Sequence, residues 1–385
     1  MGKYNFDEIV PRRGTNSYKW DTPAEGVLPM WVADMDFRTA PCVTEALRRR
    51  VEHGIFGYVK VPQSYYDAVI GWFGTRHGVR FERDRFIYTS GVVPALSAII
   101  KALTRPGDKV IVQPPVYNCF FSSIRNNGCE MLPNPLVRDG LSWRMDFDDL
   151  ETKAADPRAK VMILCNPHNP AGRVWTEEEL RRVGEICLRN NVFVISDEIH
   201  CELTYPEHDY TPFASLGEDF RLHSATCISP SKAFNIAGLQ IANIIADDRE
   251  ILSRIDRAIN VNEVCDVNPF GVEATLAAYS PEGADWLDAL RGYLYANYMT
   301  VKAFFSGRIP QCPVTELEGT YLVWIDVSAT GLNADEVTAR LLDEQKLMVN
   351  SGTMYGPGGE NFIRLNIACP RTLLLDGLER LNRVL

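Results

Sequence analysis

The sequence lacks the features that mark membrane, secreted and nucleic-acid-binding proteins. No run of about 18 apolar residues occurs, and no apolar run follows the charges of the amino terminus, so we expect neither a membrane span nor a secretion signal. The longest basic block is Arg48-Arg49-Arg50 and the formal net charge is −10, whereas a phosphate-backbone binder needs a basic patch. We therefore expect a cytoplasmic protein that binds neither membranes nor nucleic acids.

Cysteine pairs with metal-site or redox spacing are also absent. The ten cysteines stand singly, without a C-x-x-C pair: Cys42, Cys119, Cys129, Cys165, Cys187, Cys201, Cys227, Cys265, Cys312 and Cys369. Several lie inside apolar runs, so we expect reduced and mostly buried thiols. We predict no metal site.

Repeats and low-complexity stretches are missing too, which leaves an ordinary globular chain. Its 385 residues are 46% hydrophobic and 23% charged, which excludes disorder, collagen and coiled coil as descriptions of the whole. At about 150 residues per domain, the length suggests two to three domains.

The middle of the chain alternates short apolar runs with helical patterns. Five runs of four to six residues, rich in valine and isoleucine, cover 109–113, 160–165, 191–196, 225–229 and 242–246. Such runs are typical of strands buried on both faces of a parallel or mixed sheet. Between the second and third, Thr176 and Glu179 form a capping box ahead of an amphipathic helix, which makes a βαβ unit.

The last hundred residues have a different pattern. A long amphipathic stretch at 285–305 is followed by strand signals at 320–327 and 361–368, separated by a helical segment at 334–345. This order predicts a separate α+β domain. The first 45 residues lack a βαβ pattern and are expected to pack against it. We therefore predict an α/β protein with a large domain at 46–276 and a smaller domain formed by 1–45 and 277–385.

Four segments at the carboxyl ends of predicted strands carry chemistry, because an open α/β sheet binds ligands there. In the first, Ser90-Gly91-Val92 follows a strand and opens a helix with Pro94 in its first turn. Free backbone amides and the positive helix dipole favour a phosphate at this position. In the second, two Asn-Pro steps make a rigid turn that aims the amides of Asn166 and Asn169 at one place.

The other two segments supply an acid and an amine. Asp197 and Glu198 end an apolar strand, where a buried carboxylate needs a cationic partner. Lys232 follows a later strand, flanked by Ser229 and Ser231 and then by apolar residues. An amine in an apolar pocket has a lowered pKa and becomes a nucleophile. A lysine, an acid for the pyridine nitrogen and an anion site are the parts that pyridoxal phosphate requires.

Taken together, these motifs resemble the class I/II aminotransferase family of fold-type I pyridoxal-phosphate enzymes, and within it the cystathionine β-lyase branch. The resemblance rests on motifs that run in the family's order from about residue 10 to 370: LPMWVADMDF, GYVKVPQSYYDAVIGWF, QPPVYNCFF, NPHNPAGRVW, SDEIHCEL, SPSKAFNIAGLQ and NFIRLNIACP. It implies a large cofactor-binding domain, with a mainly parallel mixed sheet sandwiched by helices, and a smaller α+β domain.

The resemblance also implies roles for individual residues around the cofactor. Lys232 matches the Schiff-base lysine, which then removes the substrate's α-proton and returns protons. Asp197 matches the partner of the pyridinium nitrogen, and Asn169 the donor to the 3-oxygen. Tyr117 matches the tyrosine stacked on the pyridine ring. His200 stands where the aminotransferases usually have a tyrosine, and is either a neighbour of the 3-oxygen or a packed structural histidine.

Further positions match the phosphate and substrate sites. The phosphate is expected at the amides of Gly91 and Val92 and the hydroxyls of Ser229 and Ser231. Tyr58 matches a tyrosine that the partner subunit contributes, which implies a homodimer with shared active sites. For the substrate, the resemblance implies three binding residues: Arg364, the backbone of Ala33 beside Trp31, and Tyr58. Asn350 and Tyr355 are further candidate pocket liners.

Two reactions use this same set of residues. The first is α,β-elimination on cystathionine or an L-cysteine S-conjugate, giving a thiol, pyruvate and ammonia. The second is transfer of the amino group to a 2-oxo acid. The branch-specific motifs favour the lyase, and no second arginine for a dicarboxylate side chain is identifiable. A non-enzymatic regulator that keeps a pyridoxal-phosphate domain is a remote third interpretation, because no DNA-binding segment accompanies the domain.

Overall fold

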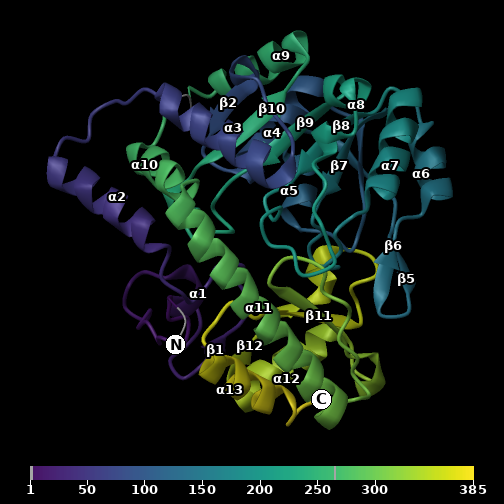
Figure 1. Ribbon diagram of the computed structural model, residues 1–385. Coiled ribbons are helices and arrows are strands. Elements are labelled where there is room, and N and C mark those ends of the chain that lie inside the picture. The colour runs from purple at the N-terminus through teal and green to yellow at the C-terminus, as the bar shows by residue number, and fades with distance from the viewer. Residues whose placement is uncertain (1–2, 264–265) are drawn as a thin grey trace.

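A seven-stranded sheet dominates the computed structural model, which describes residues 3–263 and 266–385; Cys265 lies outside them. The strand order is β2-β10-β9-β8-β7-β3-β4, and β10 is antiparallel to both of its neighbours while the other pairings are parallel. The strands are β2 (Phe86–Thr89), β3 (Lys109–Val112), β4 (Glu130–Pro133), β7 (Ala159–Cys165), β8 (Phe193–Asp197), β9 (Ser224–Ile228) and β10 (Ala242–Ala246). The predicted mixed, mainly parallel sheet is confirmed (Figure 1).

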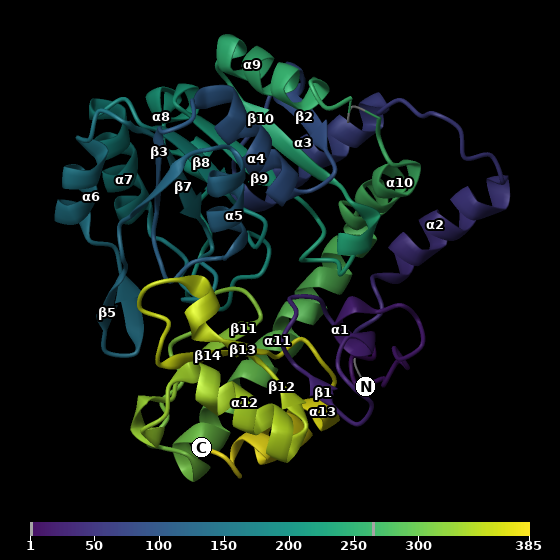
Figure 2. The ribbon, with the colours of Figure 1, turned by 180° about the vertical axis from the view of Figure 1, so that it is seen from behind.

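Helices cover both faces of this sheet, as its apolar composition requires. Side chains alternate along β3, so that Val110 and Val112 pack in one cluster and Ile111 in another. The first cluster includes residues of α4 (Val92–Leu103), α5 (Cys119–Asn126) and α9 (Arg249–Asn260). The second includes residues of α6 (Phe147–Ala154) and α7 (Glu177–Arg189), and α8 (Glu218–Leu222) follows nearby (Figure 2).

The predicted βαβ unit is present as β7, α7 and β8. The Thr176 side chain accepts from the Glu179 amide, and the Glu179 side chain accepts from the Thr176 amide, so the capping box forms as expected. The five apolar runs became β3, β7, β8, β9 and β10. Strand β4 and the short hairpin of β5 (Val137–Asp139) and β6 (Ser142–Arg144) were not predicted, because β4 is half exposed and the hairpin strands have three residues each.

A second, smaller sheet is built from the carboxyl-terminal part of the chain. Its order is β11-β14-β13, all antiparallel, with β11 at Leu322–Asp326, β13 at Asn350–Ser351 and β14 at Phe362–Asn366. Beside it lie α12 (Ala334–Gln345) and α13 (Arg371–Leu381), and α11 (Pro281–Arg308) runs from the large sheet down to this region (Figures 1 and 2).

The amino-terminal segment joins the carboxyl-terminal region. Strand β1 (Leu28–Pro29) pairs in parallel with β12 (Leu347–Met348), just after the short helix α1 (Tyr18–Asp21). The remaining helices are α2 (Pro41–His53), α3 (Gln63–His77) and α10 (Pro269–Ala278). The predicted domain boundaries near 46 and 276 fall inside α2 and α10, and the division into two domains stays a prediction.

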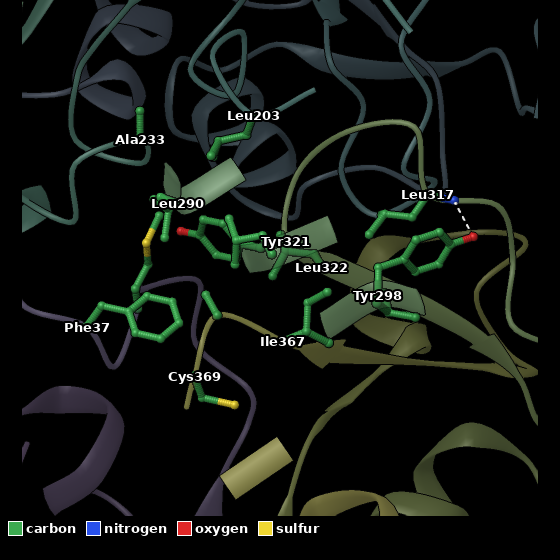
Figure 3. Packing of buried hydrophobic residues seen from close by; sticks show 14 of the residues in the cluster. Phe37, Leu203, Ala233, Leu290, Tyr298, Leu317, Tyr321, Leu322, Ile367 and Cys369 are labelled. Carbon is green, nitrogen blue, oxygen red and sulfur yellow. Dashed lines mark hydrogen bonds between the residues drawn. The ribbon is translucent and has the colours of Figure 1, made fainter. Parts of the chain in front are cut away.

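One apolar cluster connects the two chain ends with the loop that carries Lys232. Figure 3 shows part of it, with Phe37 from the amino-terminal segment, Ala233 after the lysine, Leu290 from α11 and Leu322 from β11. Because this packing spans segments far apart in sequence, it fixes the amino-terminal segment against the lysine loop.

Membrane-spanning helices and cysteines are the two remaining features for which the sequence made a prediction. No helix within 3–263 or 266–385 is long and apolar enough to span a membrane. The nine described cysteines are free thiols, and seven of them are buried.

Candidate active site

A cavity of about 200 Å³ lies at the carboxyl ends of β7 and β8. Its wall brings together nine of the residues that the sequence singled out: Ala33, Gly91, Val92, Tyr117, Asn169, Asp197, His200, Ser231 and Lys232. They come from six separate stretches of the chain. Arg364 adjoins this wall through Asn169, whereas Ser229 and Tyr58 do not line it.

Lys232 is mostly buried in the loop after β9. Its Nζ donates to the carbonyl oxygen of Ala33 at 2.6 Å. Burial lowers the pKa of the amine to about 8, helped by the positive charge of Arg364 and opposed by the charges of Asp34 and Asp197. About a tenth of the amine is therefore unprotonated at pH 7, far more than for an ordinary lysine, and this form is the one that acts as a nucleophile or a proton acceptor.

Asp197 ends β8 and is 4% exposed. Burial raises the pKa of its carboxyl to about 7, the neighbouring charge of Glu198 adds to this, and the Ile199 amide and Lys232 oppose it. The hydrogen bond that the structure gives this carboxylate, among the described residues, comes from the Ile199 amide at 3.2 Å. A cationic ligand group beside Asp197 would return its pKa toward the ordinary value.

Arg364 stands on β14 and is 3% exposed. Its Nη1 donates to Asn169 Oδ1 at 3.0 Å, its Nη2 donates to the carbonyl of Trp31 at 2.9 Å, and its guanidinium lies over the ring of Tyr355, 4.9 Å from the centroid. Its buried Nε has no partner among the described residues. Since leaving a buried charged donor unpaired is costly, this atom indicates a missing anionic ligand.

The neighbours of Arg364 are held in a small network. Asn350 Nδ2 donates to Tyr355 Oη at 3.0 Å and to the carbonyl of Trp31 at 3.1 Å. Asn350 and Tyr355, which the sequence suggested as pocket liners, therefore lie beside Arg364 and do not line the cavity.

His200 is 3% exposed and packs edge-on against Tyr321, with ring centroids 6.1 Å apart. Burial, together with the charges of Lys232 and Arg364, lowers the pKa of the imidazole well below its usual range, so the ring is neutral. Its Nδ1 is buried without a partner in the described part of the chain. His200 therefore lines the cavity and also has a buried ring nitrogen to which no described residue hydrogen-bonds, which a purely structural histidine would leave unexplained.

Tyr117 reaches the cavity from the turn between β3 and α5. The amide of Val116 donates to the carbonyl of Tyr355 at 2.9 Å, which ties this turn to the carboxyl-terminal region. Tyr117 also packs edge-on against Phe120, with centroids 5.9 Å apart, and burial raises the pKa of its hydroxyl. The ring thus presents a neutral aromatic surface to the cavity.

The amino end of α4 lies at the cavity wall. Gly91 is the N-cap residue, and no side chain accepts from the first amides of this helix. The backbone amides of residues 91–93 have no partner inside the helix, and Pro94 has no N–H, so an anion is favourable at these three amides. Ser231 and Gln240 line the same cavity. Gln240 is the last residue of the motif SPSKAFNIAGLQ, eight residues after the lysine of that motif, and no role was predicted for it from the sequence.

Ser229 and Asn166 have other partners than the sequence suggested. The hydroxyl of Ser229 donates to the carbonyl of Ile241 at 2.6 Å and accepts from the amide of Ser231 at 3.1 Å, so its proton is already committed. The amide of Asn166 donates to the carbonyl of Asp197 at 2.9 Å and extends the sheet. Of the two asparagines, only Asn169 faces the cavity.

Tyr58 is 94% exposed, in the extended segment between α2 and α3. Ile55 and Phe56 in the same segment are 66% and 57% exposed. Figures 1 and 2 show this segment as a loop at the edge of the chain, and its Phe56 packs against Phe270 of α10, with ring centroids 5.7 Å apart. Within one chain, Tyr58 takes no part in the cavity.

A larger groove of about 710 Å³ lies elsewhere, between α3, the loop after β8 and α11. His77, Cys201 and Glu202 lie close enough there to share an ion. However, Glu202 already accepts from Trp72 Nε1 at 2.6 Å, contacts His77 Nε2 at 2.7 Å and accepts from Arg76 Nε at 3.2 Å. The carboxylate is satisfied by the protein itself, and the structure gives no sign that a ligand is missing.

Fold and site together define a class I/II aminotransferase-type protein. The description "Aminotransferase class I and II" matches residues 26–381, and the chain belongs to this family.

Among individual proteins, the chain is similar to cystathionine beta-lyase PatB of Bacillus subtilis, with 47% identity over 99% of this chain and 100% of PatB. It also resembles the solved structure of cystalysin from Treponema denticola, which contains a pyridoxal 5'-phosphate cofactor. The TM-score is 0.96 and the identity 32%, over 99% of this chain and 98% of cystalysin. The PLP-bound C-S lyase of Staphylococcus hominis has a TM-score of 0.93 and 34% identity, over 99% and 98%.

Proposed function

We propose that the protein is a pyridoxal-phosphate-dependent carbon-sulfur β-lyase. It acts by α,β-elimination on cystathionine or other L-cysteine S-conjugates and releases a thiol, pyruvate and ammonia. The observation that carries the proposal is the cavity in which Lys232, with a pKa lowered to about 8, lies together with Asp197, Asn169 and the amino end of α4. The full-length similarity to PatB supports the lyase reaction.

The residues present fit the cofactor. Among the described residues no cationic group hydrogen-bonds to Asp197, and a protonated ring nitrogen would supply one. The amino end of α4 with Ser231 suits the phosphate. Asn169 and His200 would hold the ring's 3-oxygen, and Tyr117 would cover the ring. Once bound, pyridoxal phosphate supplies the electron sink that makes the bonds at the substrate's α-carbon easier to break.

The protein's own groups then bind the substrate and move its protons. Arg364 is placed to bind the α-carboxylate, with its Nε free and its plane fixed over Tyr355. Lys232 removes the α-proton, and its depressed pKa suits this task near neutral pH. The carboxylate of Asp197 would keep the ring nitrogen of the cofactor protonated and positively charged. The buried wall around these groups excludes water.

The proposal includes a homodimer in the cytoplasm. Tyr58 and the apolar residues beside it are exposed on a loop at the edge of the chain. We propose that this segment packs on a second copy, where Tyr58 completes the phosphate site of that copy. Burying such apolar side chains in an interface is favourable.

The test is an assay with cystathionine. Purified protein loaded with pyridoxal phosphate is incubated with cystathionine, and thiol and pyruvate are measured. Equal amounts of both, formed without an added 2-oxo acid, are expected. If neither forms while amino groups pass to an added 2-oxo acid, the protein is an aminotransferase and the lyase proposal is wrong. If neither reaction occurs although the protein binds the cofactor, a regulatory role takes its place.

A further inference from the structure

A strap of six residues, Trp31–Asp36, crosses the candidate site and binds it through main-chain carbonyls. The carbonyl of Trp31 accepts from Arg364 Nη2 at 2.9 Å, and that of Ala33 accepts from Lys232 Nζ at 2.6 Å. Tyr321, a residue that is 1% exposed, also donates its hydroxyl to the carbonyl of Ala33 at 2.9 Å. Both cations of the proposed mechanism are thus held by the strap.

The far end of the strap is tied down by a cluster of four charges that the mechanism does not use. Lys19 is 1% exposed, and its Nζ lies 2.8 Å from Asp36 Oδ2 and 3.6 Å from Asp34 Oδ1. Arg12 bridges the same two carboxylates at 2.7 Å each. Trp20 Nε1 also donates to Asp36 Oδ1 at 2.7 Å.

A buried ion pair of this kind adds little stability by itself, since apolar residues of similar size often replace it without loss. Its attested use is to specify one arrangement of the chain. Here the arrangement specified is that of the strap, because Asp34 and Asp36 belong to it and Lys19 and Arg12 do not. The amide of Asp36 further donates to the carbonyl of Ala368 at 2.9 Å.

We propose that Lys19 and Asp36 are positioning residues for Lys232: their buried pair fixes the strap so that the Ala33 carbonyl meets the lysine amine and closes the cavity over it. The proposal rests on the function proposed for Lys232. Its test, however, also uses the cofactor-free protein, so that failure of this proposal can be distinguished from failure of the proposed lyase function.

Several groups face the Lys232 amine from the elements around it. Arg364 on β14 disfavours its charged form, whereas Asp197 on β8, Asp34 on the strap and Cys119 on α5 favour it. The uncharged rings nearby are His200, Tyr117 and Tyr321. If the strap loosens, water enters and the burial that lowers the amine's pKa is lost, so the pKa rises toward its ordinary value.

The experiment compares Lys19→Met with wild type and with a matched control. Lysine labelling of cofactor-free protein by an amine-reactive reagent is followed against pH, by mass spectrometry of the peptide that contains Lys232. Lys19→Met is expected to raise the labelling midpoint by about one pH unit and to speed amide exchange in the strap. In loaded enzyme, kcat should fall about tenfold with a smaller change in KM.

Lys109→Met is the control. Lys109 Nζ pairs with Asp156 Oδ2 at 2.6 Å, at the amino end of β3, whereas the candidate site lies at the carboxyl ends of the strands. It removes a Lys–Asp pair that is less buried than that of Lys19 and lies outside the strap, and it should leave the midpoint, the exchange and kcat unchanged. Lys19→Arg, which restores the charge, should recover the wild-type midpoint.

A folded Lys19→Met with the wild-type midpoint and strap exchange overturns the proposal, and so does an equal shift in Lys109→Met. Should Lys19→Met not fold, Trp20→Phe removes one donor to Asp36 and no charge. It should move the midpoint in the same direction by a smaller amount, and no movement overturns the proposal. A shifted midpoint in a protein without lyase activity would sink the proposed function alone.

Discussion

Asp197 and Glu202 are two buried carboxylates five residues apart in the chain, and their pKa values move in opposite directions. Burial raises the pKa of Asp197 to about 7. Burial also acts on Glu202, but hydrogen bonds from His77 and Trp72 and the charges of His77 and Arg76 outweigh it, and its pKa is lowered. The difference lies in the partners: Glu202 is paired with cationic and donor side chains of the protein, whereas Asp197 needs a cation from a ligand.

The same contrast separates the two cavities. The groove at Glu202 has about 710 Å³ and the cavity at Asp197 about 200 Å³, so size alone would select the wrong one. At the smaller cavity, buried atoms of His200 and Arg364 lack partners within the described residues, while the side chains that line the groove leave no such atom. Unsatisfied polar atoms, more than volume, mark the place where a ligand belongs.

The largest expected effect comes from the amine of the smaller cavity. Lys232→Ala should lower kcat for elimination by about 10³-fold or more, because it removes both the covalent attachment and the proton acceptor. Pyruvate release measures it. His77→Gln in the groove, assayed on the folded fraction, should keep turnover near the wild-type value. Full activity in Lys232→Ala would contradict the assignment of the active site to the smaller cavity.

The next effect concerns stability. Glu202→Gln should lower the free energy of unfolding by about 3 kcal/mol at pH 7, because Arg76 and His77 lose their buried partner. The folded pKa of Glu202 lies below its ordinary value, so this contribution is present above about pH 4.5 and fades as the pH falls through the folded pKa. Denaturant titrations at pH 7 and pH 4 would show it, and an unchanged midpoint at pH 7 would contradict the pairing.

A smaller effect is expected at the substrate arginine. Arg364→Lys should lower kcat/KM about tenfold to a hundredfold, mainly through KM, because an ammonium cannot bind a carboxylate with two parallel donors. Arg291→Lys is the matched change in the groove, where Arg291 Nε donates to the carbonyl of Thr204 at 3.0 Å. Steady-state kinetics should leave that variant unaffected. Equal losses in both would remove the distinction between the two cavities.

The smallest effect is a gain in stability at the cost of function. The folded pKa of Asp197, about 7, exceeds its ordinary 3.8. The unfolded chain therefore loses this proton first, and stability present below about pH 4 is lost as the pH rises to 7. In cofactor-free protein, Asp197→Asn should raise the free energy of unfolding by about 1 kcal/mol at pH 8 and leave it unchanged at pH 4. A loss at pH 8 would show that Asp197 is already paired.

Much of this arrangement could be predicted from the sequence where the signal is local. Runs such as ANIIA became strands because valine and isoleucine favour buried sheet, and strand ends then placed Asp197 and Lys232 in one cavity. The paired state of Ser229 was not visible, since it depends on Ile241, twelve residues away.

Contacts across long stretches of chain were the part that the sequence could not show. Tyr321 reaches Ala33 from 288 residues away, and Glu202 meets Trp72 across 130 residues. No local pattern indicates which buried carboxylate is paired, because the partner arrives through tertiary packing.

The most direct test of the central claim is to locate the covalent cofactor. Protein loaded with pyridoxal phosphate is reduced with borohydride, digested and analysed by mass spectrometry. We predict one reduced phosphopyridoxyl group per chain, on Lys232 beside the Asp197 cavity. Stoichiometric label on any other lysine, with Lys232 unmodified, would contradict the account.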